Sequence, residues 1–495
     1  NGVLMPIYSL TEGITQAFLR KLTRRALAVC DLSDTLPAEV RDALALWSWA
    51  AAVRQLHYPA LDEPDTRQAW ARIRFDELLA QQLWLKIMRR TEAADNAPPL
   101  NQIGPGVKGL IARLPFELTE AQKQAWAEIS NDLSQRRPMR RLLQGDVGSG
   151  KTVVAALAVC QAVDNGYQAA VMAPTDILAV QHFSRLSDWF SSLGIRCGLL
   201  SSSVERREAK ACRQALAEGD LDVVVGTHAL FQDQVVFRRL GLLLIDEQHR
   251  FGVEQRFRLR RKGEAPHQLL MSATPIPRTL AMTYLADVDL SVIDQLPPGR
   301  QPVKTKLINA SRRMTLIDWV ANACRQHRQV YWVCPLIDES DWMALQTARQ
   351  ACDDIRARCP DLRVEIIHGK MKPAEKRAVM DAFSAGEIDI LTATTVIEVG
   401  VDVPQASIMV IESAQRFGLA QLHQLRGRVG RGCIQAICVL MYELPLSAVA
   451  RERLKILFET SDGFEVARRD MVLRGAGDYY GVRQSGMPLL RFADP

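Results

Sequence analysis

One short segment of the sequence has the residue types and spacing of a phosphate-binding loop. Residues 145–152, Gly-Asp-Val-Gly-Ser-Gly-Lys-Thr, fit the pattern Gly-x-x-x-x-Gly-Lys-Thr between an apolar run and a candidate helix. Glycines let successive backbone N–H groups turn toward phosphate oxygens, and a helix that begins there adds the positive end of its dipole. We expect Lys151 to contact the β- and γ-phosphates of ATP and the Thr152 hydroxyl to bind Mg²⁺. The other predicted ATP contacts of this loop are Gly145, Gly148, Ser149 and Gly150.

Two adjacent carboxylates follow a second apolar run. Residues 242–245 are Leu-Leu-Leu-Ile, and Asp246 and Glu247 come directly after them. Parallel sheets place their chemistry in the loops at the carboxyl ends of strands. We expect Asp246 to act on Mg²⁺, indirectly or through water, and Glu247 to act on the attacking water. A strand that ends in Asp-Glu also fits a solvated sheet edge, but downstream of a phosphate loop the pair predicts nucleotide hydrolysis.

Short apolar runs alternate with longer helical stretches from residue 140 onward, in two series. Such alternation is typical of parallel, doubly wound sheets. The break at Pro297, Pro298 and Gly299 between the two series predicts two α/β lobes, each with a doubly wound parallel sheet. The candidate strands are 142–144, 169–173, 222–226, 242–246 and 268–272 in the first series, and 330–334, 364–368, 388–393, 408–412 and 437–442 in the second.

The segments outside the two lobes are predicted to be helical. Apolar residues recur at helical spacing over 66–90, and the segment 96–105 is rich in Pro, Asn and Gly, which indicates a linker. The tail predicts a helix pair, 447–459 and 464–474, followed by a Gly-rich loop. The predicted domains are a helical segment at 1–100, an ATP-binding lobe at 101–298, a second lobe at 299–445 and a tail of helices and loop at 446–495.

The composition is that of a globular protein with several domains. Of 495 residues, 48% are hydrophobic and 24% charged, which excludes a disordered or fibrous chain. We expect a cytoplasmic protein without a membrane partner, since no apolar run could cross a bilayer and no basic-then-apolar leader begins the sequence. None of the ten cysteines forms a Cys-x-x-Cys pair, which argues against a zinc site or a disulfide framework. The net charge of +6 weakly favours a partner that carries phosphates.

The strand-end acids belong to a quartet, Asp246-Glu-Gln-His249, that resembles motif II of the superfamily 2 helicases. Segments from 116–122 to 424–431 resemble the other motifs of that superfamily in the same order. The resemblance implies that Gln122 reads adenine and that Arg428 and Arg431 are arginine fingers, which would stabilise charge on the transferred phosphoryl group. It further implies nucleotide contacts at Gly400 and Asp402, nucleic-acid phosphate contacts at Thr175, Thr227 and Thr395, and coupling roles for Gln248, His249, Ser272 and Thr274.

Several longer stretches resemble the RecG family of branch-migration helicases. They are residues 246–253, 272–282, 296–300 and 423–426. The similar transcription-repair coupling translocases usually have Asp-Glu-Glu-His and a phenylalanine in the phosphate loop, so Gln248 and Ser149 favour RecG. The tail resembles the translocation motif that both families share, with Arg474, Arg483 and Gln484 at its polar positions. It departs from that motif at Ala476, Tyr479, Tyr480 and Val482.

The resemblance spans nearly the whole chain but not the N-terminal wedge domain of the family, which we expect this chain to lack. It implies a DNA-stimulated, Mg²⁺-dependent ATPase that translocates on duplex DNA and remodels stalled forks and four-way junctions in recombination and repair. It also implies single-stranded-DNA-binding protein as a partner, and we expect a monomer. One alternative is a transcription-repair coupling translocase acting on RNA polymerase. The other is a non-catalytic nucleic-acid clamp, which intact Lys151, Asp246, Glu247 and Arg431 oppose.

Overall fold

The computed structural model divides into two compact units. One holds helices from the first 90 residues together with residues 492–493, and the other holds the rest of the described chain. None of the described helices is long and apolar enough to pass through a bilayer. The structure describes residues 6–10, 13–59, 65–92, 96–202, 204–247, 262–263, 265–273, 288–297, 301–335, 341–394, 403, 405–430, 435–474 and 492–493.

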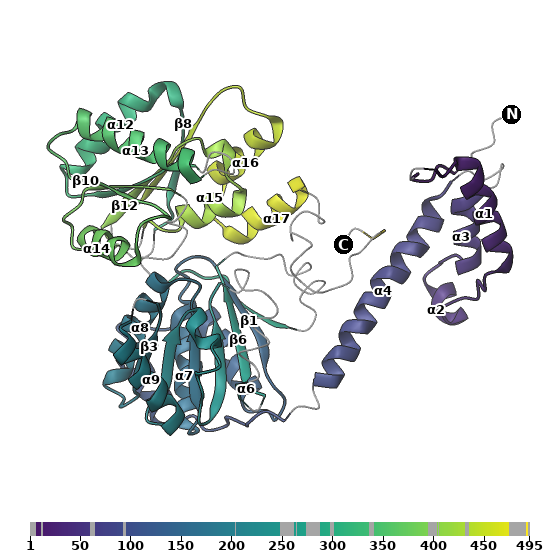
Figure 1. The fold of residues 1–495 in the computed structure, drawn as a ribbon, viewed down its shortest axis with the longest axis horizontal. Coiled ribbons are helices and arrows are strands. Elements are labelled where there is room, and N and C mark those ends of the chain that lie inside the picture. Colours follow the sequence, from purple (N-terminus) through teal and green to yellow (C-terminus); the bar gives the residue numbers. More distant parts are fainter. Residues whose placement is uncertain are drawn as a thin grey trace. The chain divides into compact units, whose positions relative to one another are not determined.

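The first α/β lobe is built on a parallel sheet. Its described strands are β1 (Arg140–Gly145), β2 (Gln168–Met172), β3 (Cys197–Leu200), β4 (Val223–Gly226), β5 (Leu240–Ile245), β6 (His267–Ser272) and β7 (Asp289–Ile293). They lie in the order β3-β4-β2-β5-β6-β1-β7, with every neighbouring pair parallel. In Figure 1, β3 is labelled on one side of this lobe and β1 and β6 on the other. Strand β5 is buried along its whole length, as expected for a continuous apolar run in a sheet covered on both faces.

Helices alternate with the strands of this sheet along the chain. They are α5 (Pro105–Arg113), α6 (Glu120–Leu133), α7 (Lys151–Asp164), α8 (Asp176–Ser191) and α9 (Arg206–Glu218), with a 3₁₀ turn at His228–Phe231. Residues 153–162 of α7 are all buried, which is the property of a helix that packs centrally rather than at the surface. Helix α8 packs on β3 and β4. The phosphate loop follows β1 and α8 follows β2, so both begin at the carboxyl edge of the same parallel sheet.

The second α/β lobe repeats this plan. Its described strands are β8 (Lys304–Asn309), β9 (Gln329–Val333), β10 (Val364–Ile367), β11 (Ile390–Ala393), β12 (Ala406–Ile411) and β13 (Ile437–Tyr442), in the parallel order β10-β11-β9-β12-β13-β8. Its helices are α12 (Arg313–Cys324), α13 (Asp341–Arg358), α14 (Pro373–Ser384) and α15 (Leu419–Arg426), with 3₁₀ turns at Ala310–Arg312 and Ala414–Arg416. Helices α16 (Ala448–Glu459) and α17 (Gly463–Arg474) follow and pack on α15.

The predicted fold class of two doubly wound parallel lobes is confirmed. Each of the ten candidate strands coincides with an observed strand, and the two predicted tail helices correspond to α16 and α17. The described chain also contains three strands that the sequence did not reveal: β3, β7 and β8. Strands β3 and β8 lie at sheet edges and are only partly buried, and β7 has polar residues among its apolar ones. Strand β3 is a run of only four residues, and β7 and β8 lack the continuous apolar run by which a buried strand is recognised.

The N-terminal unit contains α1 (Gln16–Val29), α2 (Ala38–Ala43), α3 (Trp49–His57) and α4 (Arg67–Glu92), the last of which matches the predicted helix at 66–90. Residues from the far end of the chain also contact α4. The backbone N–H groups of Phe492 and Ala493 donate to the Glu77 carboxylate at 2.8 and 2.7 Å, and the Phe492 ring lies 5.9 Å from that of Trp70. The sequence carried no signal for this contact.

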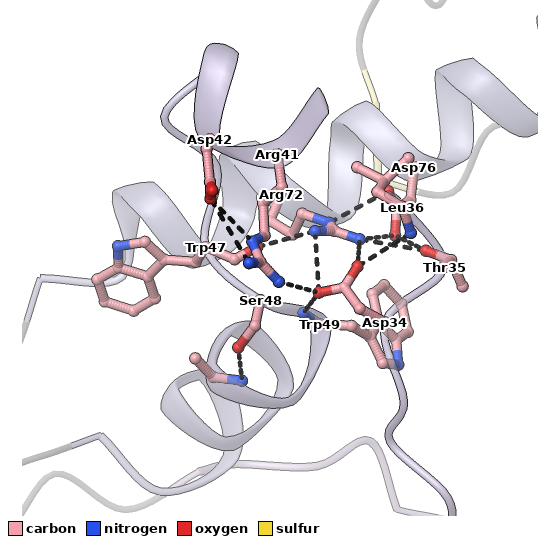
Figure 2. Close-up of polar contacts among 11 residues, drawn as sticks. Asp34, Thr35, Leu36, Arg41, Asp42, Trp47, Ser48, Trp49, Arg72 and Asp76 are labelled. Carbon is pink, nitrogen blue, oxygen red and sulfur yellow. Dashed lines mark hydrogen bonds and ion pairs between the residues drawn. The ribbon is translucent and has the colours of Figure 1, made fainter. Parts of the chain in front are cut away.

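A buried arginine connects the helices of this unit (Figure 2). The side chain of Arg72 on α4 has no exposed surface, and it donates to Asp34 at 2.7 Å, to Asp76 at 3.1 Å and to the carbonyl oxygen of Trp47 at 2.9 Å. Burial would raise the pKa of Asp34, but the hydrogen bond and charge of Arg72, together with the N–H groups of Leu36 and Trp49, outweigh it and hold that pKa well below its ordinary value. Arg72 thus fixes the segment that joins α1 to α3 against α4.

Replacing Arg72 by methionine should destabilise the N-terminal unit. Removing one partner of a buried ion pair leaves the other charge uncompensated, which costs about 3–5 kcal/mol. Hydrogen exchange in the full chain should show loss of protection in α3 and α4. The control is Arg67→Met, because Arg67 lies on the same helix and is 89% exposed where it pairs with Asp65. Equal protection in both variants would contradict a structural role for Arg72.

Candidate functional site

The phosphate loop connects β1 to α7. Gly148 and Gly150 have φ values of 77° and 87°, a region that glycine adopts without strain. The Lys151 ammonium lies across the loop and donates to the carbonyl oxygens of Gly145 at 2.7 Å and Asp146 at 3.0 Å. The loop thus curves around the Lys151 ammonium group. Such a curved loop is expected where backbone N–H groups bind phosphates.

Gln122 on α6 contacts the phosphate loop. It forms a capping box with Thr119, accepting from the Thr119 N–H at 2.9 Å, and its Nε2 donates to the Ser149 carbonyl oxygen at 2.9 Å. The side chain is buried, and a Cβ added to Gly150 would collide with it. Gln122 therefore lies beside the loop, while its contact with adenine stays a prediction.

Asp246 follows β5, and two groups orient its carboxylate. Nε2 of His182 on α8 lies 2.8 Å from Oδ2, and the backbone N–H of Glu247 donates to Oδ1 at 3.0 Å. Burial would raise the pKa of Asp246, but the interactions with His182, the positive charge of Lys151 and the N–H of Glu247 together outweigh it, so the pKa lies below its ordinary value. The result is an ionised carboxylate inside the lobe, near the phosphate loop.

Glu247 has the opposite electrostatic environment. Burial, followed by the charge of Asp246, raises its pKa, and Lys151 and Arg428 oppose that rise. Its φ of 48° lies in the left-handed region, which is uncommon for a residue with a side chain and is concentrated at functional sites. The two adjacent acids are thus differentiated: one stays ionised, and the other has the greater affinity for a proton.

The second lobe contacts the phosphate loop through α15. Nδ1 of His423 accepts a hydrogen bond from Nη2 of Arg426 at 2.8 Å. The proton of the imidazole is therefore on Nε2, which donates it to Oδ1 of Asp146 at 2.7 Å. Burial would raise the pKa of Asp146, but the interactions with His423, the Val147 N–H and the charge of Lys151 together outweigh it, so the pKa lies below its ordinary value. Beyond α15, a Cβ added to Gly427 would come within 2.7 Å of Val147 Cβ, so the backbones approach closely there.

Arg426 links the same helix to the tail. Its Nη1 donates to the carbonyl oxygens of Leu457 at 3.0 Å and Thr460 at 2.7 Å, and its Nη2 donates to that of Ser461 at 3.1 Å. These carbonyls lie at the end of α16 and in the connection to α17. One buried guanidinium therefore joins the tail helices to the histidine that contacts the phosphate loop.

The loops after β2, β3 and β4 are tied together by Asp176. The Thr175 side chain caps α8 by accepting from the Leu178 N–H, and the Thr227 hydroxyl donates to Asp176 at 3.3 Å. The hydroxyl and the backbone N–H of Ser202 also donate to Asp176. The predicted phosphate contacts Thr175 and Thr227 thus lie together on the carboxyl edge of the sheet.

The structure brings together Gln122, the phosphate loop, Asp246, Glu247 and Arg428, the last being 8% exposed. Ser272 ends β6 and is buried. Arg474 ends α17, but its side chain is outside the described part of the structure. The other predicted site residues lie outside the described residues: Gln248, His249, Thr274, Thr395, Gly400, Asp402, Arg431, Arg483 and Gln484.

Four residues of this site were not assigned a role from the sequence. Asp146 is one of the variable positions of the loop pattern, and His182, His423 and Arg426 lie on helices. His423 and Arg426 belong to a stretch that carried the family resemblance, which was the one available signal. Helical residues find their partners only when the helices pack, so spacing along the chain does not identify them.

Comparison with known proteins agrees with this geometry. The family model described as DEAD/DEAH box helicase matches residues 119–283, and the helicase conserved C-terminal domain matches 313–433. The protein named ATP-dependent DNA helicase RecG of Pasteurella multocida is 49% identical over 505 residues, covering 99% of this chain and 73% of its own length. The protein of the same name from Bacillus subtilis is 44% identical over 500 residues, covering 99% of this chain and 72% of its own.

A solved structure, RecG bound to a three-way DNA junction, matches with a TM-score of 0.75 and 38% identity. The match covers 99% of this chain and 65% of that one, so the chain spans slightly less than two thirds of the solved protein. The helicase MrfA bound to DNA is 18% identical over 75% of this chain and 55% of its own, with a TM-score of 0.57, and shares the fold alone. Sequence identity over nearly the entire chain, the two helicase domains and the matching structure establish that this chain belongs to the RecG family of ATP-dependent DNA helicases.

Proposed function

We propose that the chain is an ATP-dependent translocase on double-stranded DNA that remodels branched DNA, by fork reversal and by branch migration of four-way junctions. The observation that carries the proposal is the approach of His423 and Arg428 of the second lobe to the phosphate loop and Glu247 of the first. A nucleotide site with groups from both lobes makes hydrolysis depend on lobe closure, and closure can be converted into movement.

The hydrolytic chemistry follows from the differentiated acids. Lys151 would contact the β- and γ-phosphates, and Glu247, whose pKa is raised, would orient the water and accept its proton. Arg428 would act as an arginine finger, which in related hydrolases increases the rate by about 10³–10⁵. Arg431 is proposed as its partner, and Gly400 and Asp402 as further nucleotide contacts.

Mg²⁺ fits the residues of this site. Asp246 stays ionised although it is buried, and hard cations prefer such oxygen ligands. The described residues include no cluster of three or more acidic, histidine or cysteine side chains that would enclose a metal. Mg²⁺ usually binds through one or two protein oxygens, substrate phosphates and water, so Thr152 and Asp246 would suffice. The ion would neutralise charge between the β- and γ-phosphates.

DNA would be held by its backbone. Thr175, Thr227 and Thr395 are proposed to contact phosphates, which fixes position without reading sequence. Gln248, His249, Ser272 and Thr274 are proposed to couple this contact to hydrolysis, and Arg474, Arg483 and Gln484 to couple closure to duplex DNA. The contact of Arg426 with the tail backbone supports a mechanical role for α16 and α17.

The proposed domain division is a helical segment at 1–100, lobes at 101–298 and 299–445, and a translocation tail at 446–495. We also propose a cytoplasmic monomer that binds single-stranded-DNA-binding protein. The identity with RecG relatives favours this function over that of a transcription-repair coupling translocase or a non-catalytic clamp.

The function is tested by measuring ATP hydrolysis without DNA and with single-stranded, duplex, forked and four-way DNA. We expect stimulation by duplex DNA and the strongest stimulation by branched DNA. Lys151→Ala is the matched control and should abolish turnover while it leaves DNA binding largely intact, because the predicted DNA contacts lie on other loops. Turnover that no DNA stimulates would contradict the proposed function, and hydrolysis near the parental rate by Lys151→Ala would contradict the nucleotide site.

Glu247→Gln should bind ATP normally but hydrolyse it about 10²–10⁴-fold more slowly, because an amide cannot accept the proton of the attacking water. Affinity for a fluorescent ATP analogue and single-turnover hydrolysis give the two quantities separately. Glu117→Gln is the control, since Glu117 is exposed. A parallel loss of affinity and turnover in Glu247→Gln would indicate a binding or folding role.

His423→Ala should lower the DNA-stimulated kcat/KM for ATP by about 10- to 100-fold, which corresponds to one hydrogen bond to a charged group. The reason is that the donation to Asp146 holds α15 against the phosphate loop. The same loss is expected in Asp146→Ala, and the double variant should be little worse than either. Additive losses would show that the two side chains act independently.

A further inference from the structure

His182 is a largely enclosed histidine that none of the roles proposed so far uses. It lies on α8 in the first lobe, and its side chain and that of Asp246 are 12% and 14% exposed. Its Nε2 is 2.8 Å from Oδ2 of Asp246. Since the ionised carboxylate of Asp246 can only accept hydrogen bonds, Nε2 carries the hydrogen of this bond.

This hydrogen bond restricts how the carboxylate can turn. Oδ2 is held by His182 and Oδ1 by the backbone N–H of Glu247, so the carboxyl plane is defined from both sides. Groups that hydrogen-bond to a metal-binding carboxylate orient it, and their removal typically lowers metal affinity or activity about 10- to 100-fold. His182 is placed to do this for a cation that binds with the nucleotide phosphates.

The helix that carries His182 begins at the loops proposed to contact DNA. Asp176, in the first turn of α8, accepts from Thr227 and from Ser202, which follow β4 and β3. Thr175 caps the same helix. His182 is six positions after Asp176 on α8, which corresponds to about 9 Å along the helix axis. An α-helix is stiff over that length, so a shift of these loops would be carried to the bond between His182 and Asp246.

We propose that His182 is a positioning residue that orients Asp246 for the metal–phosphate site and makes that orientation respond to the strand-end loops joined by Asp176. DNA phosphates bound at those loops would thereby tune ATP hydrolysis through α8. The inference rests on the proposed function, because it takes the nucleotide site and the DNA-contacting loops from there.

The test compares His182→Ala with His182→Gln in the full chain. The Nε2 of glutamine can take the place of the imidazole Nε2 and donate to Asp246, whereas alanine has no donor. The control is Ser184→Ala, an exposed position on the same helix. Three quantities are measured: the affinity for a non-hydrolysable ATP analogue in Mg²⁺ and in EDTA, the Mg²⁺ concentration for half-maximal hydrolysis, and the ratio of hydrolysis with and without duplex DNA.

In His182→Ala we expect the Mg²⁺-dependent part of the analogue affinity to fall about 10- to 100-fold and the half-maximal Mg²⁺ concentration to rise by a similar factor. Affinity in EDTA should not change, and the DNA stimulation ratio should fall. His182→Gln should recover most of each loss, and Ser184→Ala should match the parent. Asp176→Ala should reduce the DNA stimulation ratio while the half-maximal Mg²⁺ concentration measured without DNA stays at the parental value.

The proposal is overturned if His182→Ala keeps the parental Mg²⁺ dependence and stimulation ratio. It is also overturned if His182→Ala and His182→Gln are impaired equally in all three measurements and both melt at a lower temperature. That outcome would show that the bond between His182 and Asp246 is purely structural. A parent that shows Mg²⁺-dependent analogue binding but no DNA-stimulated hydrolysis would instead contradict the proposed function. The binding measurements would then still decide whether His182 orients Asp246.

Discussion

The carboxylate of Asp246 keeps its charge although it is largely buried at the end of β5. Several elements of the first lobe supply the groups that compensate this charge. An ionised carboxylate without partners in a protein interior costs several kcal/mol. Here the compensation comes from Lys151 at the start of α7 and from His182 on α8. Both helices follow strands of the same parallel sheet, whose order brings their first turns to the edge where β5 ends. The sheet topology thus brings a lysine and a histidine that are distant in sequence close to one negatively charged side chain.

The contact between lobes depends on a second acid, which is half-buried. Asp146 belongs to the phosphate loop, and its partner His423 comes from the other sheet. Arg426 determines which nitrogen of His423 carries the hydrogen, because an arginine can only donate. The same guanidinium engages the backbone after α16. The nucleotide loop, the second lobe and the tail are therefore connected by consecutive polar contacts that require only two side chains of α15.

The sequence predicted the repeating part of the fold well and the irregular part less well. Buried parallel strands are continuous apolar runs, so strands such as β2, β5 and β12 could be recognised directly. Edge strand β8 carries polar residues at exposed positions and resembles a loop, and edge strand β3 has only four residues, Cys-Gly-Leu-Leu, which is too short to stand out. In the site, residues that form a local pattern, such as Lys151 and Asp246, were predicted with their neighbours. His182 could not be, because its partner is 64 residues away and only the packing of α8 brings them together.

The open border of the second sheet shows how the lobe limits unwanted pairing. Strand β8 is the last strand in that sheet, so one row of its backbone groups has no neighbouring strand in the described chain. Its sequence begins Lys-Thr-Lys, and both Lys304 and Lys306 are exposed. A strand from another molecule that docked there would have to place its own backbone beside two ammonium groups and strip water from them. Exchanging these lysines for valine would remove both charges from the border and favour intermolecular sheet growth, so these two side chains contribute to solubility at high concentration.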